Sequence, residues 1–447
     1  MNAAWTKYLP HLFRRRLEGR HNLQKIISNT GWLLMDKVVR MGVGLIVGVW
    51  IARYLGPEQF GILNYATAFV ALFATIATLG LDGIAVRDIV REPGNKNDIL
   101  GTVFILRLTG GLATLFFTSV TIYALRSADA LTRWLVAIIA AGTVFQAFDV
   151  IDYWFQSQVQ SRYTVVAKNA AFLLTALLKV FLLFVKAPLM AFAFAGLIEI
   201  ILGATGLVIA YRSRGQFLIS WRWNPSWAKR LLKDSWPLIL SGMVIMVYMK
   251  IDQVMLGIMI GDRAVGIYSA AVRISEVWYF IPTIVASSVY PALIKAYHLS
   301  ERNFYEKLQT IMGYFFWGNL LLSLIIASLS SKLVALLYGP SFSDSTAVLE
   351  IHIYSGIIVS MSIIFSVKYI IDGTTKINFY GAFSGAITNV VLNLWLIKTL
   401  GPKGAAIATL ISYAVPIVVL SVLFDKRIGI AFIEAIVSPI RRMKDVS

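Results

Sequence analysis

The sequence predicts an all-α membrane protein of about twelve transmembrane helices, arranged as two six-helix bundles related by a parallel repeat. Three observations predict this fold: the apolar composition, the length of the apolar runs and a repeated glycine motif. Hydrophobic residues make up 58% of the 447 residues and charged residues 14%, against about 45–50% and about 25% in soluble domains. Because so few charged residues cannot cover a water-soluble globule, we expect the chain to lie in a bilayer.

Each predicted span is an apolar run of about 20 residues, the length that a helix needs to cross about 30 Å of hydrocarbon. Helices are expected because a lone strand leaves its backbone unpaired in lipid, and no run alternates as barrel strands do. The runs lie near 30–52, 60–80, 100–124, 133–155, 164–186, 189–211, 236–260, 266–294, 308–329, 346–371, 377–398 and 403–424.

Basic residues are distributed unevenly between the two sides that twelve spans define. The side that holds both termini carries 26 lysines and arginines outside the spans, and the opposite side carries eight. Cytoplasmic loops hold the excess of basic residues in membrane proteins, so both termini are predicted to be cytoplasmic. The first apolar run is too long for a cleaved signal peptide and is expected to remain as an anchor.

The net charge of +18 follows mostly from this topology. The most basic loop, 212–235, interleaves its bases with Trp221, Trp223 and Trp227, and Trp236 follows directly after it. Such a mixture is typical of an interfacial helix that lies against anionic lipid headgroups. We therefore expect a membrane contact at this loop and no nucleic-acid partner.

A repeated motif relates the two halves of the chain. LGPEQFGILNYA resembles IGDRAVGIYSAA 205 residues later, and this offset aligns Gly56 with Gly261 and Gly61 with Gly266. In each half, a long span is expected to enter a tight glycine turn and to re-enter the membrane at once. Because six spans separate the copies, the repeat is parallel, as in transporters whose two bundles rock about a central site. Retention of the duplication for packing alone is the alternative.

The repeat and the longest connecting loop together predict the domain organisation. The two bundles are expected to be joined by a basic linker and flanked by basic cytoplasmic segments. The predicted parts are the N-terminal segment 1–25, the first bundle 26–211, the linker 212–235, the second bundle 236–424 and the tail 425–447.

Metal and cofactor chemistry has no support in the residue pattern. The chain has no cysteine, and its four histidines lie in separate regions without metal-ligand spacing. No G-x-x-x-x-G-K-[ST] motif is present, so no nucleotide site is expected. The sequence therefore predicts no cofactor, no metal and no enzymatic reaction.

Charged residues inside the spans mark the candidate site. A charge at the centre of a membrane helix costs at least about 2.5–3.5 kcal/mol, so such groups should face a partner or a wet cavity. In the first span, Asp36 and Arg40 are four residues apart and are expected to pair. Asn389 and Asn393 form a polar stripe that serves either hydrogen bonds between helices or contact with a sugar.

Two possible cross-helix pairs lie at matching depth in the hairpin of the seventh and eighth spans. Lys250 is level with Glu276, and Asp252 is nearly level with Arg273. The two residues of the first helix point to different sides, whereas those of the second share a face, so both pairs are not expected at once. One charge is then available to a ligand or a proton. The alternative is a set of neutralised pairs that lock the bundle.

Several motifs along the chain resemble a known family. They are LGPEQFGILNYA (55–66), LGLDGIAVRDIVR (79–91), DYWFQSQVQSRY (152–163), KIDQVMLG (250–257), GIYSAAVRISEVWYFIPTIVASSVYPALIKA (266–296) and LGPKGAAIATLISY (400–413). Their order and spacing resemble the Wzx-type O-antigen and polysaccharide flippases, whose MATE-like superfamily includes multidrug exporters and lipid II flippases. The resemblance covers nearly the whole chain.

This resemblance implies an inner-membrane flippase for undecaprenyl diphosphate-linked oligosaccharide, an O-antigen or other surface polysaccharide unit, as in lipopolysaccharide biosynthesis. It implies movement from the cytoplasmic to the periplasmic leaflet by alternating access, driven by the membrane potential or an ion gradient as in a secondary transporter. A polysaccharide polymerase and a chain-length regulator are the implied protein partners. Carried over residue by residue, the substrate-binding residues are Arg40, Lys179, Lys250 and Arg273, and the ion-coupling or charge-partner residues are Asp36, Glu199, Asp252 and Glu276.

Other functions compatible with this architecture remain open. A multidrug or lipid II exporter has the same fold, and a drug exporter favours a cavity dominated by carboxylates for cationic drugs. A membrane polysaccharide polymerase or ligase needs a sizeable extracytoplasmic loop, whereas loops on that side, such as 53–59 and 261–265, are short. A purely structural scaffold fits poorly with so many charges inside spans.

Overall fold

The computed structural model of the chain describes residues 21–371, 374, 376–423 and 426–444. The described residues are mostly α-helical and include no strand. The N-terminal residues 1–20 of the predicted basic segment lie outside this described part.

The chain divides into two compact units, each with its own buried apolar core. Unit 1 contains the described residues up to Gly48 together with Phe73–Ile239. Unit 2 contains Val49–Leu72 and the described residues from Leu240 onward. The division of the chain at a linker 212–235 remains a prediction.

The apolar runs predicted from the sequence lie in helices. Within the described residues, ten helical stretches are long and apolar enough to cross a membrane. The pair Asp262–Tyr290 and Ala292–Leu299, bent by 49°, adds an eleventh if it is one span. The first stretch, Ser28–Arg91, contains two of the predicted runs, with a break in the helix at Gly56. The protein is therefore an all-α, multi-span membrane protein.

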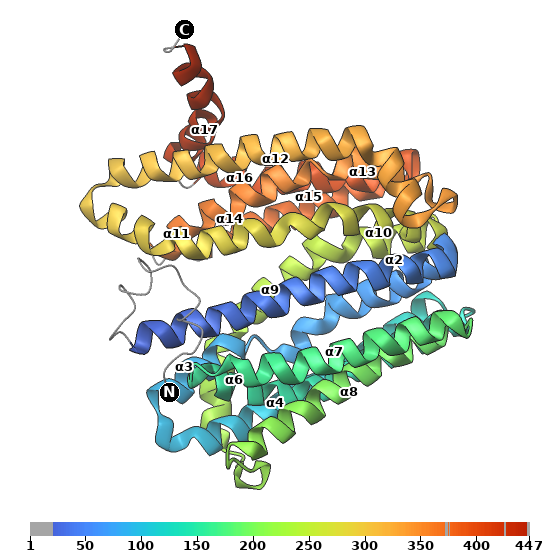
Figure 1. Cartoon of the computed structure of the whole chain (residues 1–447), viewed down its shortest axis with the longest axis vertical. Coiled ribbons are helices and arrows are strands. Elements are labelled where there is room, and N and C mark those ends of the chain that lie inside the picture. Colours follow the sequence, from blue (N-terminus) through green and yellow to red (C-terminus); the bar gives the residue numbers. More distant parts are fainter. Residues whose placement is uncertain (1–20, 372–373, 375, 424–425, 445–447) are drawn as a thin grey trace. The chain divides into compact units, whose positions relative to one another are not determined.

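Unit 1 is built from long helices that lie side by side, with short helices at one end (Figure 1). α7 packs along α8 and α4 packs along α5. Asp129 caps the start of α5, because its carboxylate accepts a 3.0 Å hydrogen bond from the backbone N–H of Thr132. The helices are α2 (His21–Thr78, shared with unit 2), α3 (Asp82–Arg91), α4 (Lys96–Leu125), α5 (Ala130–Phe145), α6 (Val150–Ser157), α7 (Ser161–Phe184), α8 (Leu189–Ser213) and the start of α9 (Pro225–Met259).

Unit 2 contains the remaining helices and the middle part of α2. α15 packs along α16, and α12 packs against α11, α14 and α17. The first half of the last helix, α17, packs along the first turns of α12, where Gln309 donates a hydrogen bond to Glu434 and Gly313 lies beside Ala435. The helices are the rest of α9, α10 (Asp262–Glu276), α11 (Phe280–Leu299), α12 (Glu301–Tyr338), α13 (Ser345–His352), α14 (Ser355–Ile371), α15 (Lys376–Leu400), α16 (Pro402–Leu423) and α17 (Lys426–Lys444).

The two copies of the glycine motif adopt similar backbone conformations. Gly56 has φ 68° and ψ 173°, and Gly261 has φ 122° and ψ 174°. Residues with a Cβ rarely adopt a positive φ, so glycine is required at both turns. Each turn separates two helical segments, as the repeat predicted.

The next glycine of each copy brings the two turns into reciprocal contact within unit 2. A Cβ on Gly61 would lie 1.8 Å from the carbonyl oxygen of Asp262, and one on Gly266 would lie 1.9 Å from that of Pro57. Pro57 and Asp262 are themselves 205 residues apart, so the contact follows the offset of the repeat. This close backbone approach ties Val49–Leu72 to the second half of the chain.

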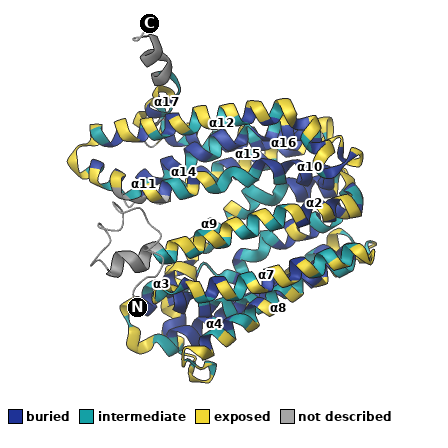
Figure 2. Cartoon of the chain, viewed as in Figure 1, coloured by how far each residue is buried: buried dark blue, intermediate teal, exposed yellow. Residues whose placement is uncertain are grey.

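The outward faces of many helices expose large apolar side chains. Phe184 is 82% exposed, Leu321 61% and Trp395 67%. Figure 2 shows exposed residues along the outer faces of α7 and α12. Exposure of this kind would be unfavourable in water but is what lipid-facing helices require.

The linker 212–235 is an α-helix only in its second half, which forms the first turns of α9. α8 ends at Ser213 and α9 begins at Pro225, with only a short 3₁₀ turn between them. Trp221 and Trp227 pack into the core of unit 1, whereas Trp223 and Trp236 are 45% and 58% exposed. The tryptophan count alone could not separate core residues from surface residues.

Hydrogen bonds hold the non-helical part of this linker onto the start of α4. The backbone N–H of Arg222 donates to the carbonyl oxygen of Asn97 at 3.1 Å. The side chain of Asn224 donates to Asp98 at 3.1 Å, and its backbone N–H donates to Thr102 Oγ1 at 3.0 Å. The loop is therefore a fixed part of unit 1.

Ion pairs join α3 to the first turns of α9. Arg87 pairs with Asp234 at 2.6 Å, and Arg230 pairs with Glu92 at 2.7 Å. The hydrogen bond from Arg230 lowers the pKa of the Glu92 carboxyl, with a smaller contribution from Asn95. These pairs fix the short helix α3 at one end of unit 1.

Candidate functional site

Four predicted site residues meet in one network inside unit 1. The Nε atom of Arg40 donates to Asp36 at 2.9 Å, which is the expected pair within α2. Glu199, on α8, lies 3.0 Å from Lys179 Nζ and 3.7 Å from a terminal nitrogen of Arg40. Arg40 also lies over the ring of Phe172 at 5.1 Å. Three helices, α2, α7 and α8, therefore bring two bases and two acids together.

A small cavity of about 220 Å³ adjoins this network. Its lining includes Arg40 and Glu199 together with Asp149 and Lys168. Lys168 pairs with Asp149 at 2.8 Å and lies 3.8 Å from Asp152. Each base at the cavity therefore has a carboxylate partner, and the charges are balanced rather than cationic.

A second polar cluster in unit 1 was not among the predicted site residues. Arg107 is 3% exposed and lies between Asp82, Asp149 and the hydroxyl group of Tyr153. Tyr153 also donates a hydrogen bond to Asp82. Sequence analysis could have found Arg107 from its position within a span, but not its partners, which lie 25 to 46 residues away.

In unit 2, Asp252 is buried among neutral hydrogen-bond donors. Its Oδ2 atom accepts from Tyr268 at 2.8 Å and from Thr409 at 2.6 Å. Its Oδ1 atom accepts from Asn393 at 2.5 Å, and Asn393 also donates to Asn389 at 2.9 Å. Asp252 is 3% exposed. Among the ion pairs of the described residues, none involves Asp252.

The polar stripe on α15 therefore forms hydrogen bonds between helices. Asn389 and Asn393 are both 0% exposed. Asn393 donates to Asp252 on α9, and Asn389 donates to Ser412 on α16 at 3.2 Å. Their burial favours this role over contact with a sugar.

Neither of the two possible cross-helix ion pairs of unit 2 forms among the described residues. Asp252 takes neutral donors instead of Arg273, whose guanidinium lies 5.7 Å from the centre of the Phe60 ring. For Lys250 and Glu276, the described part of the chain shows no ion pair within 4.0 Å. Equal depth in two helices does not fix which faces meet, so depth alone overestimated the pairing.

The arrangement of helices is similar to that of solved membrane transporters. It superposes on an inward-facing multidrug resistance MATE transporter with a TM-score of 0.70, 16% sequence identity and coverage of 90% of this chain and 98% of the other. It superposes on the inward closed conformation of the lipid II flippase MurJ with a TM-score of 0.71, 15% identity and coverage of 92% and 91%. The chain thus has the fold of the MATE and MurJ transporters.

Sequence comparison then gives the family. Residues 26–297 match the family described as "Polysaccharide biosynthesis protein", and the chain belongs to this family. The probable low-salt glycan biosynthesis flippase Agl15 of Haloferax volcanii is 22% identical over 404 residues, 86% of this chain and 80% of the relative. The probable flippase AglR of the same organism is 29% identical over 184 residues, 37% of this chain and 36% of the relative.

Proposed function

We propose that this protein is a flippase that moves a lipid-linked oligosaccharide from the cytoplasmic leaflet to the opposite leaflet by alternating access. The family match over residues 26–297 carries this proposal. The proposed substrate is an undecaprenyl diphosphate-linked O-antigen or other surface polysaccharide unit in the inner membrane. In this proposal both termini lie in the cytoplasm, and a polymerase and a chain-length regulator use the product.

The network of unit 1 supports binding of an anionic head. Arg40 holds Glu199 at 3.7 Å, a longer contact than its 2.9 Å bond to Asp36. We propose that a diphosphate displaces Glu199 from Arg40, while Lys179 remains beside the site. Arginine and lysine form strong charge-assisted hydrogen bonds to phosphate, so this exchange replaces one anionic acceptor with another. Lys250 and Arg273 are the proposed contacts in unit 2.

Transport needs no nucleotide in this proposal. A head with about two negative charges that leaves a negative interior gains about 4–5 kcal/mol at 100 mV, since each charge contributes about 2.3 kcal/mol. Asp252 is the proposed ion-coupling carboxyl group. A buried carboxylate without a basic partner is costly, and a bound proton or cation would reduce that cost. Asp36, Glu199 and Glu276 act as charge partners.

A deletion strain tests the cellular function. Loss of the gene should abolish surface polysaccharide and cause lipid-linked oligosaccharide to accumulate on the inner leaflet. Arg40→Ala should complement poorly, whereas Lys37→Ala, an exposed lysine on the same helix, should complement fully. Equal complementation by both variants at equal membrane levels would remove Arg40 from the site. Drug sensitivity without a glycan defect would favour the multidrug exporter, and shortened chains would favour the polymerase or ligase.

A further inference from the structure

Unit 2 contains a larger cavity, of about 620 Å³, that lies apart from the charged networks. It lies where α10, α13 and α16 begin, beside the turn of α2 that follows Gly56. The count of basic residues assigns this end of the helices to the extracytoplasmic side. Its volume falls within the range of about 300–1,000 Å³ that is typical of small-molecule sites.

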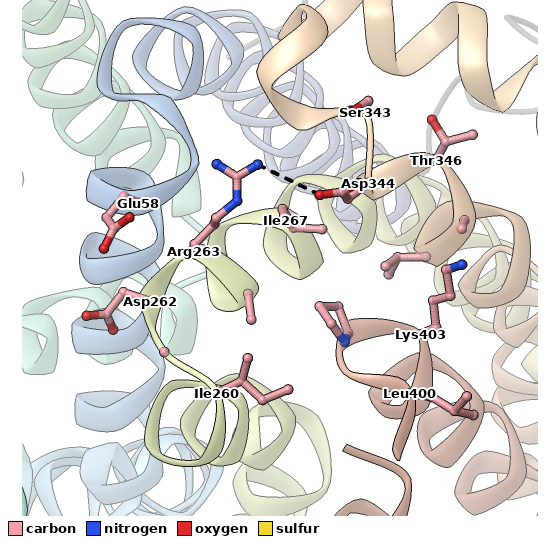
Figure 3. A pocket seen from close by; sticks show the side chains of 15 residues that line it. Glu58, Ile260, Asp262, Arg263, Ile267, Ser343, Asp344, Thr346, Leu400 and Lys403 are labelled. Carbon is pink, nitrogen blue, oxygen red and sulfur yellow. Dashed lines mark ion pairs between the residues drawn. The ribbon is translucent and has the colours of Figure 1, made fainter. Parts of the chain in front are cut away.

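The wall of this cavity combines apolar side chains with charges of both signs. Figure 3 shows Glu58 and Asp262 on one side, Lys403 on the other, and the Arg263–Asp344 pair between them. The nitrogen and oxygen atoms of that pair are 3.8 Å apart, and both side chains are more than half exposed. Apolar parts of the wall are Ile260, Ile267, Val348, Leu400 and Pro402.

The charges of the cavity wall disfavour a ligand with a large net charge of either sign. A strongly anionic group would meet the carboxylates of Glu58, Asp262 and Asp344. A polycation would meet Arg263 and Lys403, and the N-terminal ends of three helices also disfavour positive charge. The site therefore favours a ligand without net charge that can both donate and accept hydrogen bonds.

Sugar hydroxyl groups have this property, because each donates one hydrogen bond and accepts others. Carboxylates can accept from them, Arg263 and Lys403 can donate to them, and Ser343 and Thr346 can do either. The apolar residues offer surface for the C–H faces of sugar rings. Lys403 forms no ion pair among the described residues. Its ammonium group can therefore donate to a sugar without first breaking an ion pair.

We propose that this cavity is a binding site for a short uncharged saccharide. The site would hold part of the glycan head at the extracytoplasmic side, a role that rests on the proposed flippase function. The binding itself depends only on the cavity and is testable without transport. It is separate from the proposed diphosphate contacts of Arg40 and Lys179.

Saturation-transfer difference NMR on the full chain in lipid nanodiscs tests this site, with no maltoside detergent present. The probes are maltotriose, mannotriose, galactotriose and chitotriose, with inorganic diphosphate and spermidine as charged comparisons. At least one trisaccharide should bind saturably, and neither charged probe should compete. Absence of binding by all four trisaccharides, or competition by diphosphate or spermidine, would overturn the proposal.

Matched lysine variants locate the binding. Lys403→Gln should weaken trisaccharide binding about tenfold, the effect of a lost hydrogen bond to a charged group. Lys398→Gln, at the same end of unit 2 but outside the lining, should leave binding unchanged. If Lys403→Gln lowers thermal stability, Thr346→Trp should still block the cavity. Unchanged affinity in both cavity variants would refute this location.

The two proposals can fail separately. Saccharide binding without movement of lipid-linked oligosaccharide in vesicles would leave the cavity assignment intact and reject the flippase. Transport without saccharide binding would retain the flippase and reject the cavity assignment.

Discussion

Asp252 differs from two other acidic residues of the predicted site, Asp36 and Glu199, in having neutral partners. Asp36 and Glu199 each pair with a base, whereas Asp252 is held by Tyr268, Thr409 and Asn393. The sequence marked Asp252 because a charge within a span is unusual. Its partners on α15 and α16 are 141 and 157 residues away, so spacing could not identify them.

Asp252→Asn removes the charge while keeping the size of the side chain. We expect the ion-gradient stimulation of transport to disappear, since the neutral side chain needs no counter-ion. The free energy of unfolding should fall by about 1–3 kcal/mol, because the NH2 group of asparagine cannot accept the hydrogen bonds that a carboxylate oxygen accepts. Transport in vesicles with and without an imposed proton or sodium gradient measures the first effect. Glu306→Gln, which removes an exposed carboxylate on α12, is the control, and persistent stimulation in Asp252→Asn would exclude Asp252 as the coupling group.

At the scale of elements, the membrane-length helices were predictable because the thickness of the hydrocarbon layer sets their length. The helix breaks at glycine were predictable because few other residues adopt a positive φ. The packing of Trp221 and Trp227 into the core of unit 1 was not predictable, because tryptophan suits a packed core as well as a membrane interface. The partners of the charged residues on α9 and α10 could not be predicted for a related reason. Spacing gives depth along a helix, but the rotation of one helix against another depends on the whole set of packed neighbours.

The reciprocal contact of Gly61 and Gly266 predicts strong sensitivity to one added methyl group. Gly61→Ala should lower the free energy of unfolding by at least about 1–3 kcal/mol, the usual cost of overpacking. Its Cβ would lie within 1.8 Å of a carbonyl oxygen. Gly266→Ala should behave alike, as the repeat requires.

Gly42→Ala is the control for this pair, since its Cβ would meet nothing within 4 Å. It should be neutral or slightly stabilising, because alanine favours helix. Thermal unfolding of purified protein, followed by size-exclusion chromatography, measures all three variants. Equal stability of Gly61→Ala and Gly42→Ala would mean that the two turns do not pack closely.

The fixed linker predicts a contact with the membrane surface. Ile219 is 95% exposed and Phe217 54% exposed, and the loop around them is basic. Because the chain has no cysteine, a fluorophore on Ile219→Cys reports on this loop alone. Its emission should shift to the blue in vesicles rich in anionic lipid, relative to detergent. The same fluorophore on Ser343→Cys is the control. If the emission of the Ile219→Cys label does not change between detergent and vesicles, and equals that of the control, the loop lies in water.

At the scale of the whole molecule, composition and fold agree. The excess of basic residues, the apolar outer surfaces and the ten or eleven membrane-length stretches of the described chain all indicate a multi-span protein. In unit 1, acids and bases inside the spans pair with one another. In unit 2, Asp252 is instead held by neutral donors. Net charge could not predict this arrangement, since it does not show which acids and bases meet.

Transport of a fluorescent polyprenyl diphosphate-linked oligosaccharide in proteoliposomes tests the central claim most directly. The protein should move it between leaflets without ATP, faster when the potential drives negative charge outward. Arg40→Ala should slow this movement by at least about tenfold, given about 1.5–3 kcal/mol for a hydrogen bond to a charged group, while Lys37→Ala should not. Movement no faster than in protein-free vesicles, or movement that requires ATP, would contradict the account.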